Sequence, residues 1–553
     1  MNENLSPIEK IKTESNGLRG TIAESLKDEL TGALREDDQS LIKFHGMYQQ
    51  DDRDRRDERA EKKLERLYSF MIRLRLPGGF LKPEQWVAVN EIADENSTGV
   101  IKITTRQTIQ LHGILKSKIK PTIRQFNTAR LDSIATCGDI NRNVLCSAHP
   151  KQSSVHEEIF SYANKISTLL MPKTRAYYEI WLGEEKIVDK KDEDDPLYRE
   201  SYMPRKFKIA IAIPPNNDID VFTNDIGLIA IIEEKRLAGF NIAIGGGLST
   251  THGNPQTYAR LATVIGFTDT EEKTLRTIYE ILTVQRDFGN RSDRKQARLK
   301  YTVDKLGAEK FKQEVEKRTG FKLAAARPYS FNERTDYYGW FQNHEDNWYY
   351  TPFIENGRVS DEGVAMKSAL LAVARTGKAN FRFTGNQNLI IGDVSQEDKP
   401  VISKILEEYK ILQHTLTASA IRKNSIACVA LPTCPLALAE GQRYMPSLLD
   451  KIEVLLAKND LQNENIIIRM TGCPNGCARS HNAEIGFLGT APGKYNLHLG
   501  GDHAGLRLNT IYKENLDEDA ILGQLDTWFA QFKDERKPGE NFGDYSYRKL
   551  LDS

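Results

Sequence analysis

Four of the six cysteines in this chain lie close together toward its C-terminal end. They form two pairs, Cys428 with Cys434 and Cys473 with Cys477, and 38 residues separate the pairs. Four thiolates are the number of ligands that a [4Fe–4S] cluster takes. Structural zinc sites more often use two tight C-x₂₋₄-C pairs, whereas these pairs read C-x₅-C and C-x₃-C. The spacing therefore predicts an iron–sulfur site.

The turn that carries the second pair also favours a cluster. Thr471-Gly-Cys-Pro-Asn-Gly-Cys477 follows an apolar run that reads as a buried strand. Its two glycines let the backbone approach closely, so that N–H groups can point at sulfur. A four-cysteine zinc site and four ordinary buried thiols stay open as alternatives. Cys137 and Cys146 are isolated in the sequence, and we interpret them as small buried residues.

A second set of chemistry-bearing residues is cationic and lies on or beside expected strands. Alternation places Lys206 and Lys208 on one face of their segment, where two ammonium groups repel each other unless an anion lies between them. Taken singly, each cation is more often a solvated charge. As a set they predict a site for a polycarboxylate cofactor or a small oxyanion. The set comprises Arg73, Arg106, Arg142, Arg205, Lys206 and Lys208.

The composition limits the partners of the chain. Its 553 residues include 77 basic and 77 acidic side chains, so a general surface for nucleic acid is not indicated. No stretch approaches 18 consecutive apolar residues, and the first 20 residues contain no apolar signal region. Six cysteines are too few for a disulfide framework. We therefore expect a cytoplasmic protein with neither a membrane nor a nucleic-acid partner.

Helical and strand patterns mix along the whole chain, which predicts the α+β class. Residues 155–172 and 272–286 have helical spacing, whereas residues 99–113 alternate and predict a single strand. Residues 1–65 are charge-dense, and we interpret them as a solvated N-terminal arm with some helix.

A weak internal repeat is the more useful pattern. Three segments recur in the same order at shifts of 278 to 282 residues. They pair 76–79 with 354–357, 101–111 with 381–391, and 141–146 with 423–428. Such a duplication predicts a pseudo-twofold body with its site at the junction of the halves. Only the second copy contains the four cysteines, so the halves differ in role.

These residues match a known family along essentially the whole chain. The chain resembles the siroheme- and [4Fe–4S]-containing sulfite and nitrite reductases, and within them the NADPH-linked bacterial hemoprotein type. The cysteine pattern is highly specific for this family. The other matching segments are Leu18–Glu24, His45–Arg53, Arg75–Gly79, Thr105–Thr108, Asn141–Cys146, Pro204–Lys208, Gly245–Leu248, Gln285–Arg291, Ile354–Arg358 and Asn386–Ile390.

The resemblance implies a three-domain body in which duplicated sulfite/nitrite reductase repeats surround a central cofactor site. Residues 1–65 would be the charged N-terminal arm. Residues 66–135 and 336–410 would be two paired ferredoxin-like half-domains. Residues 136–335 would form the siroheme and substrate domain of the first repeat, and residues 411–553 the [4Fe–4S] and siroheme domain of the second.

The resemblance also implies roles for individual residues. Cys428, Cys434, Cys473 and Cys477 would bind the [4Fe–4S] cluster, and Cys477 would also be the axial ligand of the siroheme iron. The family's catalytic anion-binding residues match Arg73, Arg142, Lys206 and Lys208. Arg106, Gln110 and Arg205 lie in segments that resemble contacts to siroheme carboxylates. For these three, structural salt bridging is the alternative.

The implied activity is the six-electron reduction of sulfite to sulfide in assimilatory sulfate reduction. No G-x-G-x-x-G follows a strand, since residues 245–250 lack the final glycine. NADPH oxidation would therefore need a partner, which in the family is a flavoprotein carrying FAD and FMN. A siroheme nitrite reductase and a ferredoxin-dependent sulfite reductase are alternatives. A non-enzymatic iron–sulfur electron carrier is a more distant one.

Overall fold

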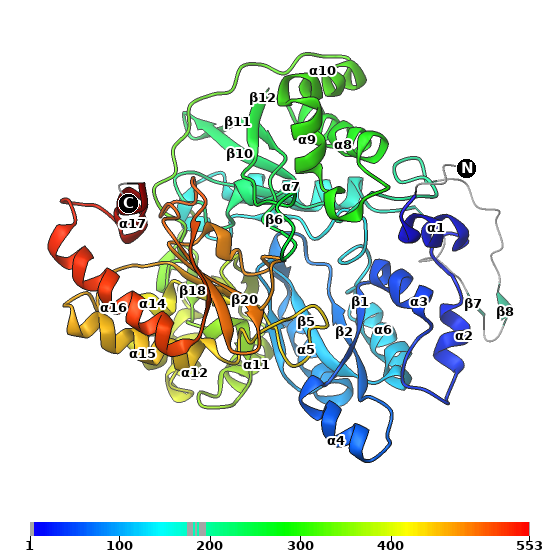
Figure 1. The fold of residues 1–553 in the computed structure, drawn as a ribbon, viewed down its shortest axis with the longest axis horizontal. Helices are drawn as coiled ribbons and strands as arrows, with labels where there is room; N and C mark the ends of the chain where they lie inside the picture. The colour runs from blue at the N-terminus through cyan, green and yellow to red at the C-terminus, as the bar shows by residue number, and fades with distance from the viewer. Residues whose placement is uncertain (1–4, 174–180, 183–184, 187–194, 552–553) are drawn as a thin grey trace.

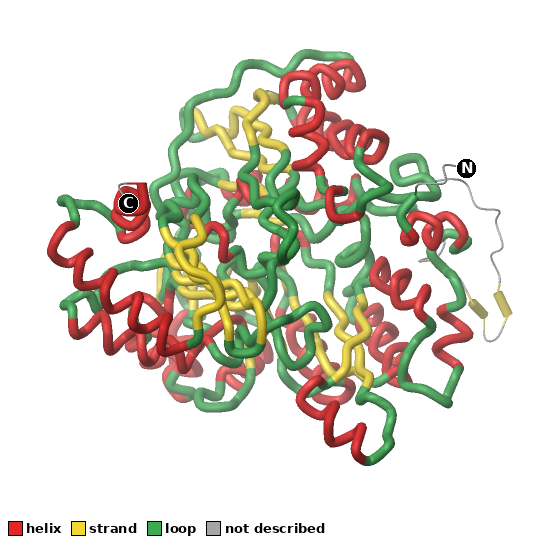
Figure 2. The backbone as a smooth tube through the Cα atoms, in the orientation of Figure 1, coloured by secondary structure: helices red, strands yellow, loops and turns green. Residues whose placement is uncertain are grey.

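The computed structural model describes residues 5–173, 181–182, 185–186 and 195–551. Helices and strands mix throughout this part of the chain (Figure 1), which confirms the expected α+β class. Its strands form four five-stranded sheets and one two-stranded sheet, in which β7 (Trp181–Leu182) pairs with β8 (Glu185–Lys186). Figure 2 shows the helices covering the outer faces of the sheets. Among the described residues, no helix combines the length and apolarity that crossing a membrane requires.

The first two sheets are built on one plan, and each borrows a strand from the other half. Their orders are β1-β2-β5-β4-β15 and β13-β14-β17-β16-β3. The first comprises β1 (Met47–Asp51), β2 (Tyr68–Arg73), β5 (Ile109–Ile114), β4 (Ile101–Ile103) and β15 (Arg358–Val359). The second comprises β13 (Gly339–Gln342), β14 (Trp348–Thr351), β17 (Leu389–Val394), β16 (Asn380–Phe383) and β3 (Phe80–Leu81).

The borrowed strands fasten the two halves together. Val359 pairs with Ile101, and Leu81 pairs with Phe381. Helices of the two halves share one apolar core, in which Trp86 stacks on Phe381 with ring centroids 5.3 Å apart. The covering helices are α5 (Pro83–Asn96), α6 (Ile119–Thr128), α11 (Met366–Arg375) and α12 (Lys399–Glu408).

The other two large sheets also share one topology. In each, the first three strands run parallel to one another. The fourth strand runs antiparallel to the third, and the fifth runs antiparallel to the fourth. One comprises β6 (Leu145–Cys146), β9 (Ile209–Ala212), β10 (Ile226–Glu233), β11 (Arg236–Ile244) and β12 (Thr263–Thr268). The other comprises β18 (Ser425–Ala427), β19 (Ile468–Thr471), β20 (Ile485–Ala491), β21 (Lys494–Leu499) and β22 (Thr510–Leu516).

Matching helices complete the two repeats. α7 (His156–Leu169) corresponds to α15 (Met445–Lys458), and α8 (Glu271–Phe288) to α16 (Glu518–Glu535), with 14 and 18 residues in each pair. α7 and α8 confirm the two helices expected from the sequence. The remaining helices are α9 (Leu299–Leu306), α10 (Ala308–Thr319), α13 (Ile411–Thr417), α14 (Ala420–Lys423) and α17 (Phe542–Leu551).

Strand register tests the expected repeat residue by residue. Ile103 pairs with Ile109, and Phe383 pairs with Leu389, which confirms the shift of 280. The third expected alignment is wrong by one residue. Cys146 lies opposite Ile211 in the first half, whereas Ala427 lies opposite Met470 in the second. Cys428 therefore corresponds to Ser147, because short alternating segments carry too little information to fix a register.

Two further expectations are corrected. Residues 99–113 form a hairpin, β4 and β5, because the chain turns between the two strands. The Thr104 N–H donates to the Thr108 carbonyl oxygen over 2.9 Å, and the Gln107 N–H donates to the Thr104 carbonyl oxygen over 3.1 Å. The N-terminal segment is not a solvated arm. Its helices are α1 (Pro7–Glu14), α2 (Ile22–Lys27), α3 (Glu36–Leu41) and α4 (Arg56–Glu61). Leu18 and Phe44 are buried in the core of the first half, and β1 is an edge strand.

A single methyl group added at the joint between the halves should destabilise the protein. Gly357 has φ +69°, and a Cβ there would lie 2.3 Å from the carbonyl oxygen of Ile103 in the other half. Gly357→Ala should lower the free energy of unfolding by more than the roughly 1–3 kcal/mol of backbone strain alone. Gly363→Ala is the control, since Gly363 has φ +78° with nothing within 4 Å of its Cβ position. Equal urea-denaturation midpoints for the two variants would contradict the clash.

Candidate active site

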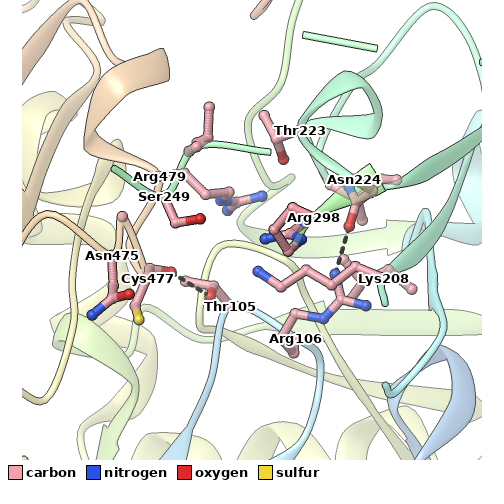
Figure 3. Close-up of a pocket in the computed structure, with 14 residues that line it drawn as sticks. Thr105, Arg106, Lys208, Thr223, Asn224, Ser249, Arg298, Asn475, Cys477 and Arg479 are labelled. Carbon is pink, nitrogen blue, oxygen red and sulfur yellow. Dashed lines mark hydrogen bonds between the residues drawn. The ribbon is translucent and has the colours of Figure 1, made fainter. Parts of the chain in front are cut away.

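A pocket lies at the seam between the two halves (Figure 3). Its wall combines the turn after β4, the end of the segment before β9, the loop before β10 and the loop after β19. Thr105 from the first half donates a hydrogen bond to the Cys477 carbonyl over 2.9 Å. The polar and charged lining residues are Thr105, Arg106, Lys208, Thr223, Asn224, Ser249, Arg298, Asn475, Cys477 and Arg479.

The four cysteines meet beside this pocket. Cys428 and Cys434 follow β18, and Cys473 and Cys477 follow β19, which pairs with β18 in parallel. The N–H of Gly472 points at the Cys428 sulfur over 3.3 Å. Burial, together with the neighbouring Cys477, raises the pKa of Cys434 to about 12. Thiols held in this way lose their protons readily only to a positively charged metal group.

The donor set fits a cluster better than a single ion. Across the described part of the chain, no group of three or more His, Cys, Asp or Glu side chains is arranged to hold one metal ion. The four thiols are thus not gathered around one point, as a four-cysteine zinc site with every sulfur about 2.3 Å from one ion would require. Cys477 is exposed and lines the pocket. It can thus serve a cluster on one side and a cofactor in the pocket on the other.

Two of the expected anion-binding arginines converge on one turn. The guanidinium groups of Arg73 and Arg142 donate to the carbonyl oxygen of Thr136 over 3.2 and 3.1 Å. Arg73 also donates to the Cys137 sulfur over 3.2 Å. Gln110, with its amide oxygen turned toward Arg73, accepts from Arg73 Nε over 2.9 Å. Gln110 thus lies against Arg73, and its expected contact with a siroheme carboxylate stays a prediction.

The two lysines have no neutralising partner among the described residues. Neither Nζ atom makes a hydrogen bond or ion pair to another described residue. Burial, reinforced by the nearby Arg205 and Arg298, lowers the pKa of Lys206 to about 7. Burial and the adjacent Lys206 hold the pKa of Lys208 well below its usual value. Such groups favour an anion between them, as the alternation in the sequence predicted.

The alternative of structural salt bridging applies to Arg205 and not to Arg106. Arg205 lies 3.9 Å from the carboxylate of Asp139. Arg106 contacts no carboxylate: it donates to Asn224 Oδ1 over 2.6 Å and to the Ile209 carbonyl over 3.3 Å. Its Nε atom has no partner in the described structure, and burial lowers its pKa to about 9. Arg106 therefore suits an anionic ligand in the pocket.

Sequence reasoning missed several residues of the pocket. Arg298 comes from the start of α9, and its charge is paired with Asp225 over 2.7 Å. Arg479 lies two residues after Cys477, and this closeness in the sequence could have indicated that Arg479 lines the pocket. Asn224 and Ser249 had no signal, because single polar residues in loops are common.

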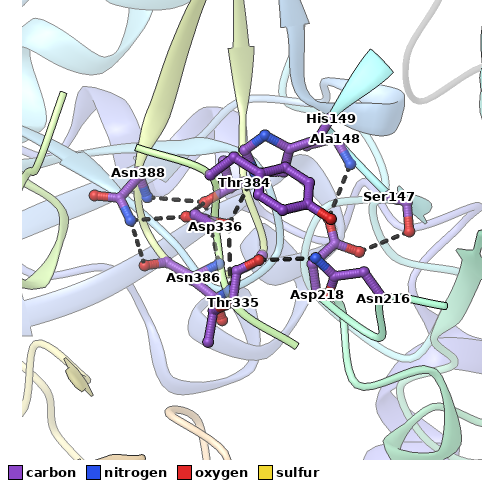
Figure 4. Close-up of polar contacts among 12 residues, drawn as sticks. Ser147, Ala148, His149, Asn216, Asp218, Thr335, Asp336, Thr384, Asn386 and Asn388 are labelled. Atoms are coloured by element: carbon purple, nitrogen blue, oxygen red, sulfur yellow. Dashed lines mark hydrogen bonds and ion pairs between the residues drawn. The ribbon is translucent and has the colours of Figure 1, made fainter. Parts of the chain in front are cut away.

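The first half has a counterpart of the cysteine site (Figure 4). By strand register, Ser147 and Asp218 take the places of Cys428 and Cys477. Ser147 Oγ donates to Asp218 over 2.6 Å, and the Ala148 N–H donates over 3.0 Å. Nearby, His149 lies 3.2 Å from Asp336, whose other oxygen accepts from Thr384 over 2.7 Å. Hydrogen bonds between protein groups therefore occupy this place in the first half.

A duplicated α+β body that joins four thiols to a cationic pocket defines a metal-cofactor oxidoreductase. Residues 63–129 and 342–409 match the family described as nitrite/sulfite reductase ferredoxin-like half domain. Residues 161–323 match the nitrite and sulphite reductase 4Fe-4S domain. This second match falls in the first repeat, which contains none of the four cysteines.

Whole proteins match over nearly the full chain. The "Sulfite reductase [NADPH] hemoprotein beta-component" of Leptospira biflexa is 62% identical over 98% of this chain and 97% of its own length. The protein of the same name from Oceanobacillus iheyensis is 50% identical over 98% and 94%. The structure of the Mycobacterium tuberculosis NirA protein superposes with a TM-score of 0.79 at 25% identity, covering 99% of this chain and 97% of that one.

The chain belongs to the nitrite and sulphite reductase family. This membership confirms three expectations: an oxidoreductase, the pair of ferredoxin-like half-domains, and the cofactors siroheme and a [4Fe–4S] cluster. The individual roles of the site residues, and the boundaries of the five expected segments, stay predictions.

Removing the Cys137 sulfur tests the turn that holds the arginines. Cys137→Ala should weaken sulfite binding several-fold, up to about tenfold, because Arg73 loses one acceptor and keeps the Thr136 carbonyl. Binding is read from the sulfite-induced shift of the visible spectrum. Cys146→Ala is the matched control, because both thiols are 0% exposed and Cys146 accepts nothing from these arginines. An equal loss of affinity in the two variants would contradict a role for the Cys137 sulfur.

Proposed function

We propose that this chain reduces sulfite to sulfide at a siroheme linked to a [4Fe–4S] cluster. The overall reaction is SO₃²⁻ + 6 e⁻ + 7 H⁺ → HS⁻ + 3 H₂O. One observation carries the proposal: Cys477 belongs to the four-thiol group and also lines a pocket whose wall is rich in cations. Four thiolates hold a cluster, and a cationic pocket holds a polycarboxylate macrocycle and an oxyanion.

The bound siroheme supplies an iron that binds sulfur and, together with the cluster, the electrons. The remaining chemistry belongs to the side chains. Arg73 and Arg142 are fixed by the Thr136 carbonyl, and we infer that their free N–H groups hold the oxygens of the substrate. Each oxygen that leaves must gain protons. Lys206, with its pKa near 7, is the donor whose proton affinity matches that task best.

The electrons come from another protein in this proposal. The chain carries no dinucleotide-binding fingerprint, and the names of the relatives from L. biflexa and O. iheyensis include NADPH. We therefore infer a flavoprotein subunit with FAD and FMN as the donor, in the cytoplasm and in assimilatory sulfate reduction. The division of residues 66–553 given above, with paired half-domains and two cofactor domains, belongs to the same proposal.

Spectroscopy and turnover test the proposal together. Siroheme bands that shift when sulfite is added to the dye-reduced protein would place the haem and an open anion site in one pocket. Sulfite and nitrite turnover with a reduced dye then distinguishes the two family activities, since both substrates are oxyanions reduced by six electrons. A spectrum with cluster absorption alone, from cells that make siroheme, would favour an electron carrier.

Truncating Lys206 should separate catalysis from cofactor binding. Lys206→Ala is expected to lower sulfite turnover by about a hundredfold or more, because a buried proton donor is lost. Iron, acid-labile sulfide and the siroheme spectrum should stay unchanged. Lys317→Ala is the control, since the Lys317 side chain is 80% exposed. Loss of siroheme or cluster from the Lys206 variant would refute the assigned role.

The pH dependence follows from the same lysine. Burial lowers the pKa of Lys206 to about 7, so its protonated form is populated below that pH and lost above it. The kcat/KM for sulfite should therefore fall as the pH rises through about 7. Lys206→Arg should lower kcat/KM and remove this limb from the profile, because a guanidinium keeps its proton and neither donates it nor titrates in this range. The ionisation of sulfite itself affects both enzymes equally, so superimposable profiles would exclude Lys206 as the titrating group.

A further inference from the structure

One buried carboxylate at the seam has no role in the function proposed above, yet three arginines contact it. Asp220 Oδ2 lies 2.6 Å from Arg469 Nη1 and 2.9 Å from Arg479 Nη1. Asp220 Oδ1 lies 3.2 Å from Arg334 Nη1. Arg469 belongs to β19, Arg479 to the loop after Cys477, and Arg334 to the segment that links the two repeats. The carboxylate thus joins three separate parts of the chain.

Asp220 and Arg479 are equivalent residues of the two repeats. Asp220 precedes the short helix η7 (Val221–Thr223), and Arg479 precedes η10 (Ser480–Asn482). Each lies six residues before a matching strand, β10 or β20. Both have the left-handed backbone that is uncommon outside glycine, with φ of 47° and 62°. The repeat therefore places two equivalent positions in contact across the seam, one with a carboxylate and one with a guanidinium.

The group formed by Asp220 and its three arginines keeps an excess of positive charge. One carboxylate contacts three guanidinium groups, and the further carboxylates that act on Arg479 are Asp218 and Asp336. Arg479 Nε and Nη1 make no hydrogen bond within the described structure, although Nη1 is close to Asp220. Arg479 also lines the pocket, whose described lining contains no Asp or Glu. In Figure 3 its guanidinium lies on the pocket side, across from Lys208 and Arg298.

We propose that Asp220 is a positioning residue that holds Arg479 at the pocket wall, where the guanidinium pairs with a carboxylate of the cofactor. This inference rests on the proposed function, in which siroheme occupies the pocket. Without Asp220 three guanidinium groups would repel one another at close range. A carboxylate on the cofactor would neutralise the remaining charge and satisfy N–H groups that the protein leaves unpaired.

Asp220→Asn tests the proposal on the holoenzyme. The variant should lose siroheme on the order of tenfold faster than the wild type, and its siroheme-to-sulfide ratio should fall, because Arg479 loses its charged partner and keeps only the Gly385 carbonyl and Asn386 Oδ1 as acceptors. Siroheme is read from absorbance and the cluster from acid-labile sulfide. Glu484→Gln is the matched control. Glu484 is also buried and accepts from the N–H groups of Ile467 and Gly543 over 2.9 and 2.8 Å, outside the pocket lining. It should lower the melting temperature and leave the ratio unchanged.

A charge exchange separates positioning from stability. Asp220→Arg with Arg479→Asp restores one opposite pair at two equivalent positions, so the melting temperature should recover relative to Asp220→Arg alone. Siroheme retention should stay low, because the pocket wall would then carry a carboxylate. Where Asp220→Asn does not fold, Arg479→Gln gives the same readout with Asp220 still paired to Arg469 and Arg334.

Three outcomes would overturn the inference: a wild-type ratio in Asp220→Asn, full siroheme retention in the exchange variant, or loss of siroheme and sulfide in equal proportion. A wild-type chain without siroheme, from cells that make it, would instead refute the proposed function, before any variant is compared.

Discussion

Positive charge buried at the seam, with too little negative charge around it, is the constraint on which the rest of this structure depends. Burial lowers the pKa of Lys206 to about 7 and that of Arg106 to about 9. Neither side chain contacts a carboxylate of another described residue. A folded chain keeps such groups charged only if anions from outside compensate them. The seam is therefore constructed to receive anions, and the proposed siroheme carboxylates and sulfite are anions of the required kinds.

Duplication explains how one seam collects groups from so many parts of the chain. Each half gives a strand to the sheet of the other, β15 to the first and β3 to the second. The halves are thereby fixed in register, and loops that follow equivalent strands face each other. The first half contributes most of the cations, and the second contributes the thiols. Fixed register matters because a charged group helps binding only when its position is set before the ligand arrives.

The sequence predicted the class, the duplication and the chemically distinctive residues, because each left a local pattern. The cysteine spacing, the alternation around Lys206 and Lys208, and the shift of 280 are visible without a structure. What failed depended on tertiary contacts. The average charge of residues 1–65 concealed Leu18 and Phe44, which bury that segment. The pocket residue Arg298 immediately precedes α9, in a segment with no distinguishing motif. Such contacts join residues whose spacing along the chain carries no signal.

The two copies of the proposed metal position indicate that side chains, and not the fold, decide which half would carry the redox chemistry. Asp218 and Cys477 occupy equivalent places after equivalent strands. Burial raises the pKa of Asp218, and its oxygens are taken by Ser147 and the Ala148 N–H, so nothing remains to bind a metal. Cys477 instead faces the pocket. Because the scaffold is the same, the difference lies in whether the side chain at this place is satisfied by the protein. A satisfied group stabilises the seam, and an unsatisfied one leaves it ready for a cofactor.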